Sequence, residues 1–465
     1  MKITFISFVL FLFTYTTSLF GQIDQFTGSW IGQLKGSGID LRIAFHISEK
    51  DGIILSKMDS PDQNVFGSSA QKTLLKDNTI MIDLPAFAIR YEGQRIGDSI
   101  IGKFFQTGAE FKLNLGPLTE VLTGPQRPQL PVAPFPYTQK DVKIKTPDEK
   151  VKLAGTLSLP TGKGPFPAVV LVSGSGPQNR NEEIMFHEPF LVLADYLTRN
   201  GIAVLRYDDR GVAQSTGNFE TANTFDFAQD AEAAWKFLAK QKKINPKKVG
   251  IIGHSEGGII APIVAARNKQ IGFIALMAGP SVPGTVVIPD QTELISRLSN
   301  VSEEEIHNQL MLQKFTSEFI TKNQDSKSLQ EDLFKEIESW LKSNAYKIPA
   351  NLSPKTFAKQ TAYTLTTNWM KTFLLTQPSH YLEQVNCPIL ALFGEKDLQV
   401  SPRANLIPMQ QLLSTKSTSK VHVFQDLNHL FQTATTGAPT EYGKIEETLA
   451  PAFLIYITNW IKNLN

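Results

Sequence analysis

Unbroken apolar runs recur after about residue 138, each as long as a buried strand. They cover residues 168–172, 203–206, 249–252, 273–277, 389–393 and 421–424. Segments with helical periodicity lie between them; in residues 225–243, for example, Phe227 and Ala231 fall on one face of a helix. Two strand-like segments, residues 142–145 and 153–159, come first. This alternation predicts an α/β domain with a mostly parallel sheet flanked by helices, whose chemistry lies at the carboxyl ends of the strands.

Residues 22–123 show a different pattern, with short apolar alternations separated by turns. Apolar side chains occupy every second position at Leu41, Ile43, Phe45 and Ile47, and again at Ile80, Ile82 and Leu84. This period predicts a small antiparallel β module, either a barrel or a sandwich. Its Gly28-Ser29-Trp30 segment resembles the opening of lipocalin-like barrels. A ligand-binding role and a role as a spacer or docking surface are both open, and we identify no catalytic group there.

A proline repeat separates the two regions. Prolines stand at every third position from Pro125 to Pro134, and Pro136 follows. This spacing favours an extended polyproline conformation, which needs no internal hydrogen bonds. We interpret residues 124–137 as a semi-rigid linker to a domain that covers residues 138–465.

The first 21 residues have the layout of a signal peptide. Lys2 precedes an apolar run from Ile3 to Phe13, and small and polar residues follow as far as Gly21. The run is shorter than the roughly 20 apolar residues that a membrane span needs. We therefore expect cleavage near Gly21, an exported protein in the periplasm or outside the cell, and no integral membrane span after the signal is removed.

Charge and cysteine content exclude several classes of function. The 46 basic and 44 acidic residues leave a formal net charge of +2, and no basic run is long enough to follow a phosphate backbone. We therefore expect no nucleic-acid partner. Cys387 is the single cysteine, and no group of Cys and His has the spacing of a zinc site. We expect no metal and no cofactor.

The strongest motif follows the apolar run at residues 249–252. Gly253-His-Ser-Glu-Gly257 is a Gly-x-Ser-x-Gly turn between this strand and an apolar helix, which is the context of a nucleophile elbow. The sharp turn exposes the hydroxyl of Ser255, and side chains at the two glycines would collide with neighbouring elements. The Glu256 N–H stands at the start of the helix, where it can receive the oxyanion that forms when Ser255 attacks a carbonyl.

A serine nucleophile needs a histidine base and a carboxylate that orients this base. In the chain order Ser, acid, His, the turn after residues 389–393 offers Asp397, with Glu395 as its rival. The loop after the last strand carries His429. We interpret the other six histidines as packing or surface residues.

With these motifs, residues from about 140 to the end resemble the α/β-hydrolase superfamily, in particular bacterial esterases and serine-aminopeptidase-like members. The resemblance implies an α/β-hydrolase fold with a helical lid insertion, here preceded by the small all-β domain. It also implies the Ser175 N–H as second oxyanion donor. Ser173 stands where the family commonly has His, so the Gly176 N–H is an alternative donor. Asp208 and Arg210 resemble a scaffold turn of the family.

Residues 281–377 interrupt the series of strands at the position of a lid. Ser302 and Glu305 form a capping box that opens one helix, and the apolar stripe from Leu329 to Leu341 marks another. Trp369, Phe373 and Tyr363 are candidates for the wall of a pocket or for the core of the lid. A lid over the nucleophile would exclude water and shape substrate selectivity.

The sequence thus predicts a serine hydrolase that cleaves a carboxylic ester through an acyl-enzyme. A serine peptidase acting on short peptides uses the same triad and is the first alternative; Glu256 or an acid of the lid would then bind the substrate amine. A non-catalytic binding protein is the second alternative. The Gly174-Ser-Gly176 segment imitates a dinucleotide fingerprint but lacks the third glycine.

Overall fold

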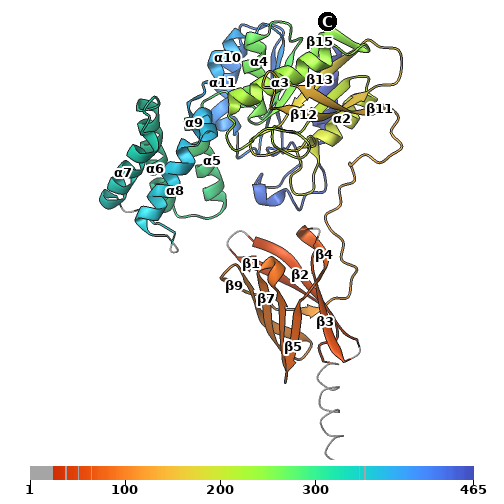
Figure 1. The fold of residues 1–465 in the computed structure, drawn as a ribbon, viewed down its shortest axis with the longest axis vertical. Coiled ribbons are helices and arrows are strands. Elements are labelled where there is room, and N and C mark those ends of the chain that lie inside the picture. Colours follow the sequence, from red (N-terminus) through yellow and green to blue (C-terminus); the bar gives the residue numbers. More distant parts are fainter. Residues whose placement is uncertain are drawn as a thin grey trace, which may run out of the picture. The chain divides into compact units, whose positions relative to one another are not determined.

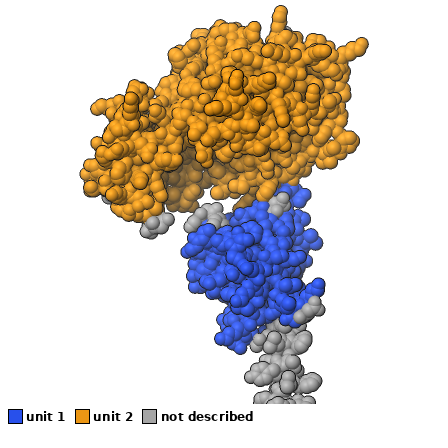
Figure 2. All heavy atoms as spheres, in the orientation of Figure 1, with its two compact units in different colours: residues 1–126 blue, residues 127–465 orange. Residues whose placement is uncertain are grey.

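The computed structural model describes residues 25–36, 39–50, 52–63, 65–344, 346–349 and 352–464. It divides into two compact units, Met1–Gln126 and Arg127–Asn465, which Figure 2 shows in blue and orange. The predicted signal peptide, residues 1–21, lies outside the described residues. In the described ranges, no helix combines the length and the apolar character that a membrane span requires.

The first unit consists of two five-stranded antiparallel sheets (Figure 1). One has the order β10-β1-β2-β3-β4 and the other β5-β6-β7-β8-β9. Their bounds are β1 Gly28–Gly36, β2 Ile39–Lys50, β3 Ile53–Ser60, β4 Val65–Ser69, β5 Lys72–Lys76, β6 Thr79–Leu84, β7 Ile89–Ile96, β8 Ser99–Gln106, β9 Ala109–Lys112 and β10 Gly116–Pro117. The predicted alternation places Phe45, Ile82 and Tyr91 in one core between these sheets. The prediction of an all-β module is confirmed.

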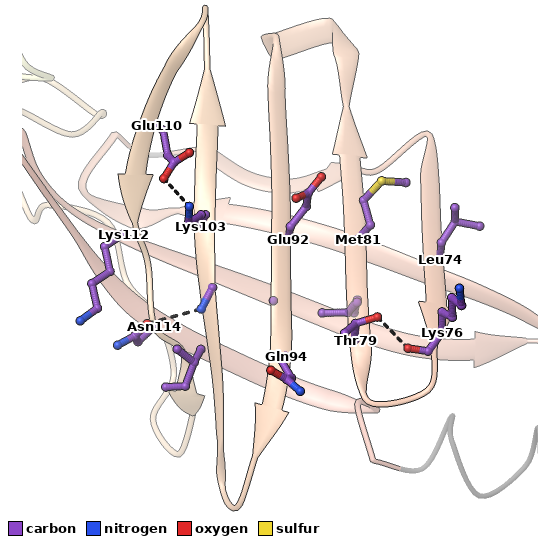
Figure 3. Close-up of a pocket in the computed structure, with 14 residues that line it drawn as sticks. Leu74, Lys76, Thr79, Met81, Glu92, Gln94, Lys103, Glu110, Lys112 and Asn114 are labelled. Atoms are coloured by element: carbon purple, nitrogen blue, oxygen red, sulfur yellow. Dashed lines mark hydrogen bonds and ion pairs between the residues drawn. The ribbon is translucent and has the colours of Figure 1, made fainter.

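The outer face of the sheet β5–β9 is hollowed. Figure 3 shows this face, where Leu74 and Met81 lie beside charged residues such as Glu92 and the ion pair of Lys103 with Glu110. The hollow has a volume of about 760 Å³ and is an open groove rather than an enclosed lipocalin-type cavity.

The proline-rich segment differs in part from the expected spacer. The division between the units falls inside it, after Gln126, and its second half is bonded to the second unit. The Arg127 guanidinium donates to the carbonyls of Gly443 and Ile445, while the Gln129 amide bonds to the main chain of Leu449. These hydrogen bonds to partly buried carbonyls therefore fix residues of the segment that the proline spacing alone would leave as a free connection.

The second unit is built on an eight-stranded sheet of order β11-β12-β14-β13-β15-β16-β17-β18. The bounds are β11 Thr138–Lys145, β12 Lys152–Leu159, β13 Phe166–Val172, β14 Ala203–Tyr207, β15 Ile244–His254, β16 Ile274–Met277, β17 Ile389–Gly394 and β18 Lys420–Phe424. Strands β13 to β18 pair with their neighbours in parallel. The pairs β11–β12 and β12–β14 are antiparallel. Each predicted apolar run forms a strand, and β14, β16 and β17 are buried along their whole length.

Helices cover both faces of this sheet and leave the carboxyl ends of its strands for the site. The bounds are α2 Pro189–Arg199, α3 Thr224–Ala239, α4 Gly257–Arg267, α10 Pro378–Gln384, α11 Pro402–Leu413 and α12 Pro451–Lys462. Helix α12 packs on α2, while α3, α4, α10 and α11 pack in a row. This arrangement is the α/β-hydrolase fold that the resemblance implied.

Five further helices lie between β16 and β17, and we call them the helical insertion. They are α5 Gly284–Leu298, α6 Glu303–Lys322, α7 Leu329–Ser343, α8 Pro354–Thr366 and α9 Asn368–Leu375. They share a small core of their own that includes Leu333, Ile337 and Leu374. In Figure 1, α6, α7 and α8 stand clear of the sheet, and α9 lies between them and α3. The insertion thus reaches the sheet domain through α5 and α9.

Candidate active site

Ser255 occupies a strained turn between β15 and α4. Its φ is 51°, in the left-handed region, which serine adopts only where its surroundings enforce it. The Ser255 N–H donates to the Met277 carbonyl at 2.8 Å. A Cβ on Gly253 would lie 2.0 Å from the Gly257 carbonyl oxygen, and one on Gly257 would lie 2.2 Å from the Val172 oxygen. The two glycines are therefore required by the close approach of β13, β15 and α4.

His429 and Asp397 meet at the carboxyl ends of β17 and β18. The His429 Nδ1–H donates to Asp397 Oδ2 at 2.8 Å, and both side chains are buried. Asp397 Oδ1 accepts from the N–H groups of Gln399 and Val400, which holds the carboxylate in place. With Nδ1 protonated, the Nε2 of His429 is left as the acceptor that a serine base requires.

The rival acid lies elsewhere. Glu395 is exposed, and its carboxylate accepts from the Asp426 N–H rather than from His429. Of the other histidines, His422 stacks on Tyr456 with ring centroids 4.2 Å apart, as a packing residue would. The acid and the histidine that the fold brings together are therefore Asp397 and His429, which follow Ser255 in the chain order acid, then His.

The pair lies against the elbow. The ring centroid of His429 is 4.8 Å from that of His254, the residue before Ser255, and the His429 carbonyl accepts from His254 Nε2–H at 3.0 Å. Within the described part of the chain, Ser255 Oγ makes no hydrogen bond. Catalytic hydrogen bonds are often loose in the absence of substrate and tighten in the complex, so this geometry is compatible with a serine and base that engage on binding.

Two backbone amides beside Ser255 are available for an oxyanion. Among the described residues, no acceptor receives the N–H of Glu256 or that of Ser175. The loop of Ser175 lies close, since a Cβ on Gly174 would be 3.1 Å from Ser255 Cβ. The Gly174 N–H is already bonded to Glu182 at 2.7 Å. The Gly176 N–H is also without an acceptor in this part of the structure, so it stays an alternative to Ser175.

The buried carboxylate of Asp209 anchors the oxyanion loop, residues 173–178. Asp209 Oδ1 accepts from Ser173 Oγ at 2.9 Å, and Oδ2 accepts from the Gln178 N–H at 3.0 Å. Burial raises the pKa of Asp209 well above its ordinary value. Ser173, where the superfamily commonly has His, thus supplies the anchor from its hydroxyl group. Asp208 and Arg210 make ion pairs with Arg180 and Asp230, in keeping with a scaffold turn.

The side chain of Glu256 is closed off from a substrate. It is 2% exposed, and its oxygens accept from Thr224 Oγ1 at 2.7 Å and from Trp369 Nε1–H at 3.0 and 2.9 Å. Burial raises the pKa of this carboxyl group. Trp369 stacks on Phe373, whereas Tyr363 is 62% exposed. Of the three aromatic candidates, Trp369 is the one that bonds directly to the elbow.

Besides the Asp209 anchor, two further arrangements in the structure were not expected from the sequence. His254, interpreted as a packing residue, lies in a buried polar network with Glu182. In the β module, Ser29 Oγ bonds to His46 Nδ1 at 2.7 Å, and His46 Nε2 to Asp59 Oδ2 at 2.8 Å. These residues stand on the neighbouring strands β1, β2 and β3, without a strand-to-helix turn, so we interpret them as cross-strand polar contacts. The register between β1 and β2, which places Ser29 opposite His46, was the signal that could have predicted this contact.

Comparisons with known proteins agree with this fold. The family model described as serine aminopeptidase, S33, matches residues 187–433, which is more than half of the 465 residues. Esterase EstD of Thermotoga maritima is 28% identical over 315 residues, which are 67% of this chain and 65% of that protein. The chain thus spans slightly less than two thirds of the length of this relative.

Further matches are more distant. Polyketide transferase claH of Penicillium crustosum is 25% identical over 132 residues, 26% of this chain and 42% of that protein. The solved esterase Pf2001 of Pyrococcus furiosus is 15% identical, with a TM-score of 0.42 over 73% of this chain and 97% of its own. On the family match, the chain belongs to the S33 serine aminopeptidase family of hydrolases, within the α/β-hydrolase superfamily.

Proposed function

We propose that the protein is an exported serine hydrolase that cleaves carboxylic esters through an acyl-enzyme. The observation that carries the proposal is the buried His429 and Asp397 pair, whose imidazole ring lies beside the residue that precedes the elbow serine. The name of the relative Esterase EstD supports the choice of an ester.

The proposed reaction has two halves. Ser255 Oγ attacks the ester carbonyl while His429 Nε2 takes its proton, and Asp397 stabilises the imidazolium through Nδ1–H. The amides of Glu256 and Ser175 donate to the oxyanion. The intermediate then collapses, and His429 returns the proton to the leaving alcohol. Water attacks the acyl-enzyme by the same route, which releases the acid and restores Ser255.

We propose the helical insertion as the lid of this site. The supporting contact is the hydrogen bond of Trp369 on α9 to Glu256, the residue that follows the nucleophile. A lid tied to the elbow would exclude water from the acyl-enzyme and form part of the substrate pocket.

The family description favours a peptidase as the second candidate. An aminopeptidase needs an unpaired acid to bind the substrate amine, and Glu256 was the sequence candidate. Both of its oxygens are engaged by Thr224 and Trp369. The lid acids Asp290 and Glu293 are paired with Arg403. These contacts favour the ester over the peptide amine.

A fluorophosphonate probe tests whether Ser255 is the nucleophile. We expect labelling of the full chain, loss of labelling in Ser255→Ala, and full labelling in Ser29→Ala. The last variant is a matched control, because it removes the serine of the other Ser-His-Asp arrangement. Labelling that persists in Ser255→Ala would contradict the proposal, and labelling that is lost in Ser29→Ala would assign reactivity to the β module.

Turnover of model substrates distinguishes the two candidates. We expect hydrolysis of short-chain nitrophenyl esters at a kcat/KM at least about 100-fold above that of aminoacyl anilides. This factor corresponds to about 2.7 kcal/mol of transition-state stabilisation. A preference for the anilides would select the peptidase. Export is tested separately, by N-terminal sequencing of the protein from the periplasm or medium, with cleavage expected near Gly21.

A further inference from the structure

Glu182 is a buried carboxylate that joins the oxyanion loop to the elbow. It lies in the segment between β13 and α2, and its φ of 53° is in the left-handed region, an unfavourable conformation for glutamate. Its Oε1 accepts from the Gly174 N–H at 2.7 Å and from His254 Nδ1 at 2.9 Å. The carboxylate therefore fixes the loop one residue before Ser175, and it withdraws the Gly174 N–H from any contact with substrate.

His254 extends this connection to the loop of the base. Its Nε2–H donates to the main-chain carbonyl of His429 at 3.0 Å. A carbonyl and a carboxylate can only accept, whereas a neutral imidazole has a single N–H. Two acceptors therefore require a proton on each ring nitrogen. An ionised Glu182 therefore implies an imidazolium at His254.

The surroundings of His254 support the charged form. Burial opposes the charge, but attraction and hydrogen bonding from Glu182, the His429 carbonyl bond and the more distant Asp397 outweigh it, so the pKa of His254 is raised. The other titratable group against the ring is His429, at 4.8 Å between centroids. Each charged group is almost fully buried, with side-chain exposures of 6% for His254 and 5% for Glu182.

The Glu182–His254 ion pair is not well suited to stabilise the fold. Glu182 Oε2 has no hydrogen-bond partner within the described residues, and its backbone is strained. Replacement of a buried ion pair by apolar residues is often neutral or stabilising. The pair is incompletely hydrogen-bonded and stands at a strained position, yet it is bonded to two loops of the site. We therefore explain it by the geometry that it imposes on these loops.

We propose that Glu182 and His254 are positioning residues that hold Ser175 and the main chain of His429 in the arrangement that acyl transfer needs. The inference rests on the proposed function, because it concerns the same site. Neither residue touches the substrate. In Glu182→Gln the charge that maintains the imidazolium is removed. With a neutral His254, an amide oxygen at the Oε1 position keeps the Gly174 bond but costs His254 one of its two bonds, whereas an amide NH₂ there loses the Gly174 bond. The oxyanion loop and the base loop would then move independently.

Kinetics with a matched pair of variants test this role. We expect kcat for a nitrophenyl ester to fall about 10- to 100-fold in Glu182→Gln, with KM within about threefold, since small misplacements of catalytic groups cost such factors. Glu183→Gln is the control, because Glu183 is exposed and its carboxylate bonds to Asn179. An unchanged kcat in Glu182→Gln would overturn the inference. A wild-type chain that neither hydrolyses esters nor takes up the fluorophosphonate would instead overturn the proposed function.

Nuclear magnetic resonance of the wild-type protein gives a readout that is independent of activity. With ¹⁵N-labelled histidine, we expect His254 to keep two protonated ring nitrogens above the ordinary histidine pKa of about 6.5, and its resonance is identified by its contact with the His429 ring. We expect one protonated nitrogen in Glu182→Gln. A neutral His254 in the wild type would overturn the inference even if the variant fails to fold.

Discussion

The indole N–H of Trp369 donates to both carboxylate oxygens of Glu256, at 3.0 Å to Oε1 and 2.9 Å to Oε2. One residue belongs to the helical insertion and the other to the elbow. This bond therefore couples the position of α9 to the residue that follows the proposed nucleophile. Thr224 supplies the remaining donor at 2.7 Å, so the carboxylate is shared between the sheet domain and the insertion.

Trp369→Phe removes this N–H and keeps most of the ring. We expect kcat/KM for nitrophenyl esters to fall about fivefold to tenfold, because a hydrogen bond to a charged group contributes about 1.5–3 kcal/mol and Thr224 compensates in part. Trp340→Phe is the control, since Trp340 stacks on Phe315 within the insertion, with centroids 6.0 Å apart. Equal kcat/KM values for the two variants would show that the bond does not influence the site.

The hydroxyl of Ser173 is expected to matter for catalysis through Asp209. Ser173→Ala leaves the buried Asp209 Oδ1 without its donor at 2.9 Å, at a cost of about 1–3 kcal/mol. We expect a kcat about tenfold lower, because the oxyanion loop loses its anchor. Ser215→Ala removes an equally buried hydroxyl that bonds to the Asp208 carbonyl. It should lower the melting temperature without lowering kcat; a loss of kcat in both variants would point to general destabilisation.

The identity of the acid can be tested by charge removal at two neighbouring positions. Asp397→Asn replaces the acceptor of His429 Nδ1–H and favours the wrong tautomer, so we expect kcat to fall about 10³- to 10⁴-fold. Glu395→Gln alters an exposed side chain and should retain kcat within about twofold. The reverse ranking, measured with the same ester, would assign the role to Glu395.

Much of this architecture could be predicted because its causes are local. Parallel strands with both faces buried must be apolar throughout, which is why residues 249–252 and 389–393 stand out. The Gly-x-Ser-x-Gly motif can be recognised from the sequence because the turn leaves no room for a side chain at Gly253 or Gly257. The positions of Asp397 and His429 follow from the ends of the strands that precede them, because the ends of parallel strands share one edge of the sheet.

The supporting residues could not be predicted, since their partners are distant in the chain. Glu182 and His254 are 72 residues apart, and no periodicity relates them. Asp209 acquires its role only when the loop after β13 folds back onto it. In the insertion, α8 and α9 meet at Thr367, and their mixed polar and apolar patterns give weaker periodicity than the stripe of α7. Two of the five insertion helices were therefore predicted.

Close packing at the elbow gives a prediction about stability. Gly253→Ala would place a methyl group 2.0 Å from the Gly257 carbonyl oxygen, a backbone contact that cannot relax without moving α4. We expect the melting temperature to fall by more than about 5 °C, or soluble protein to be lost, because overpacking costs about 1–3 kcal/mol or more. Gly443→Ala is the control, since its nearest neighbour would be Met185 Cβ at 3.9 Å. Melting temperatures within about 1 °C of each other for the two variants would contradict the steric argument.

His187 gives a prediction for the acid side of the stability profile. It is fully buried; its Nε2 lies 2.9 Å from the Tyr442 carbonyl oxygen and 3.0 Å from Gln432 Nε2, and its Nδ1 bonds to Thr448 Oγ1 at 2.9 Å. Burial lowers its pKa to about 4, whereas the unfolded chain titrates near its ordinary value of about 6.5. Between these values the unfolded state binds a proton that the folded state does not. The free energy of unfolding should therefore fall as the pH drops from about 6.5 to 4, by at most about 1.4 kcal/mol per pH unit from this group.

Urea unfolding at intervals across this pH range measures the contribution of His187. We expect a shallower decrease of the unfolding free energy in His187→Gln than in the wild type, because the variant lacks the titrating ring. The total stability of the variant will also fall, but the difference in the slope of the unfolding free energy against pH reports the proton uptake of His187 alone. His307→Gln is the control, since His307 is exposed on α6 and its removal should leave the slope unchanged. Equal slopes for the wild type and His187→Gln would mean that His187 accepts a proton in the folded protein as readily as in the unfolded chain.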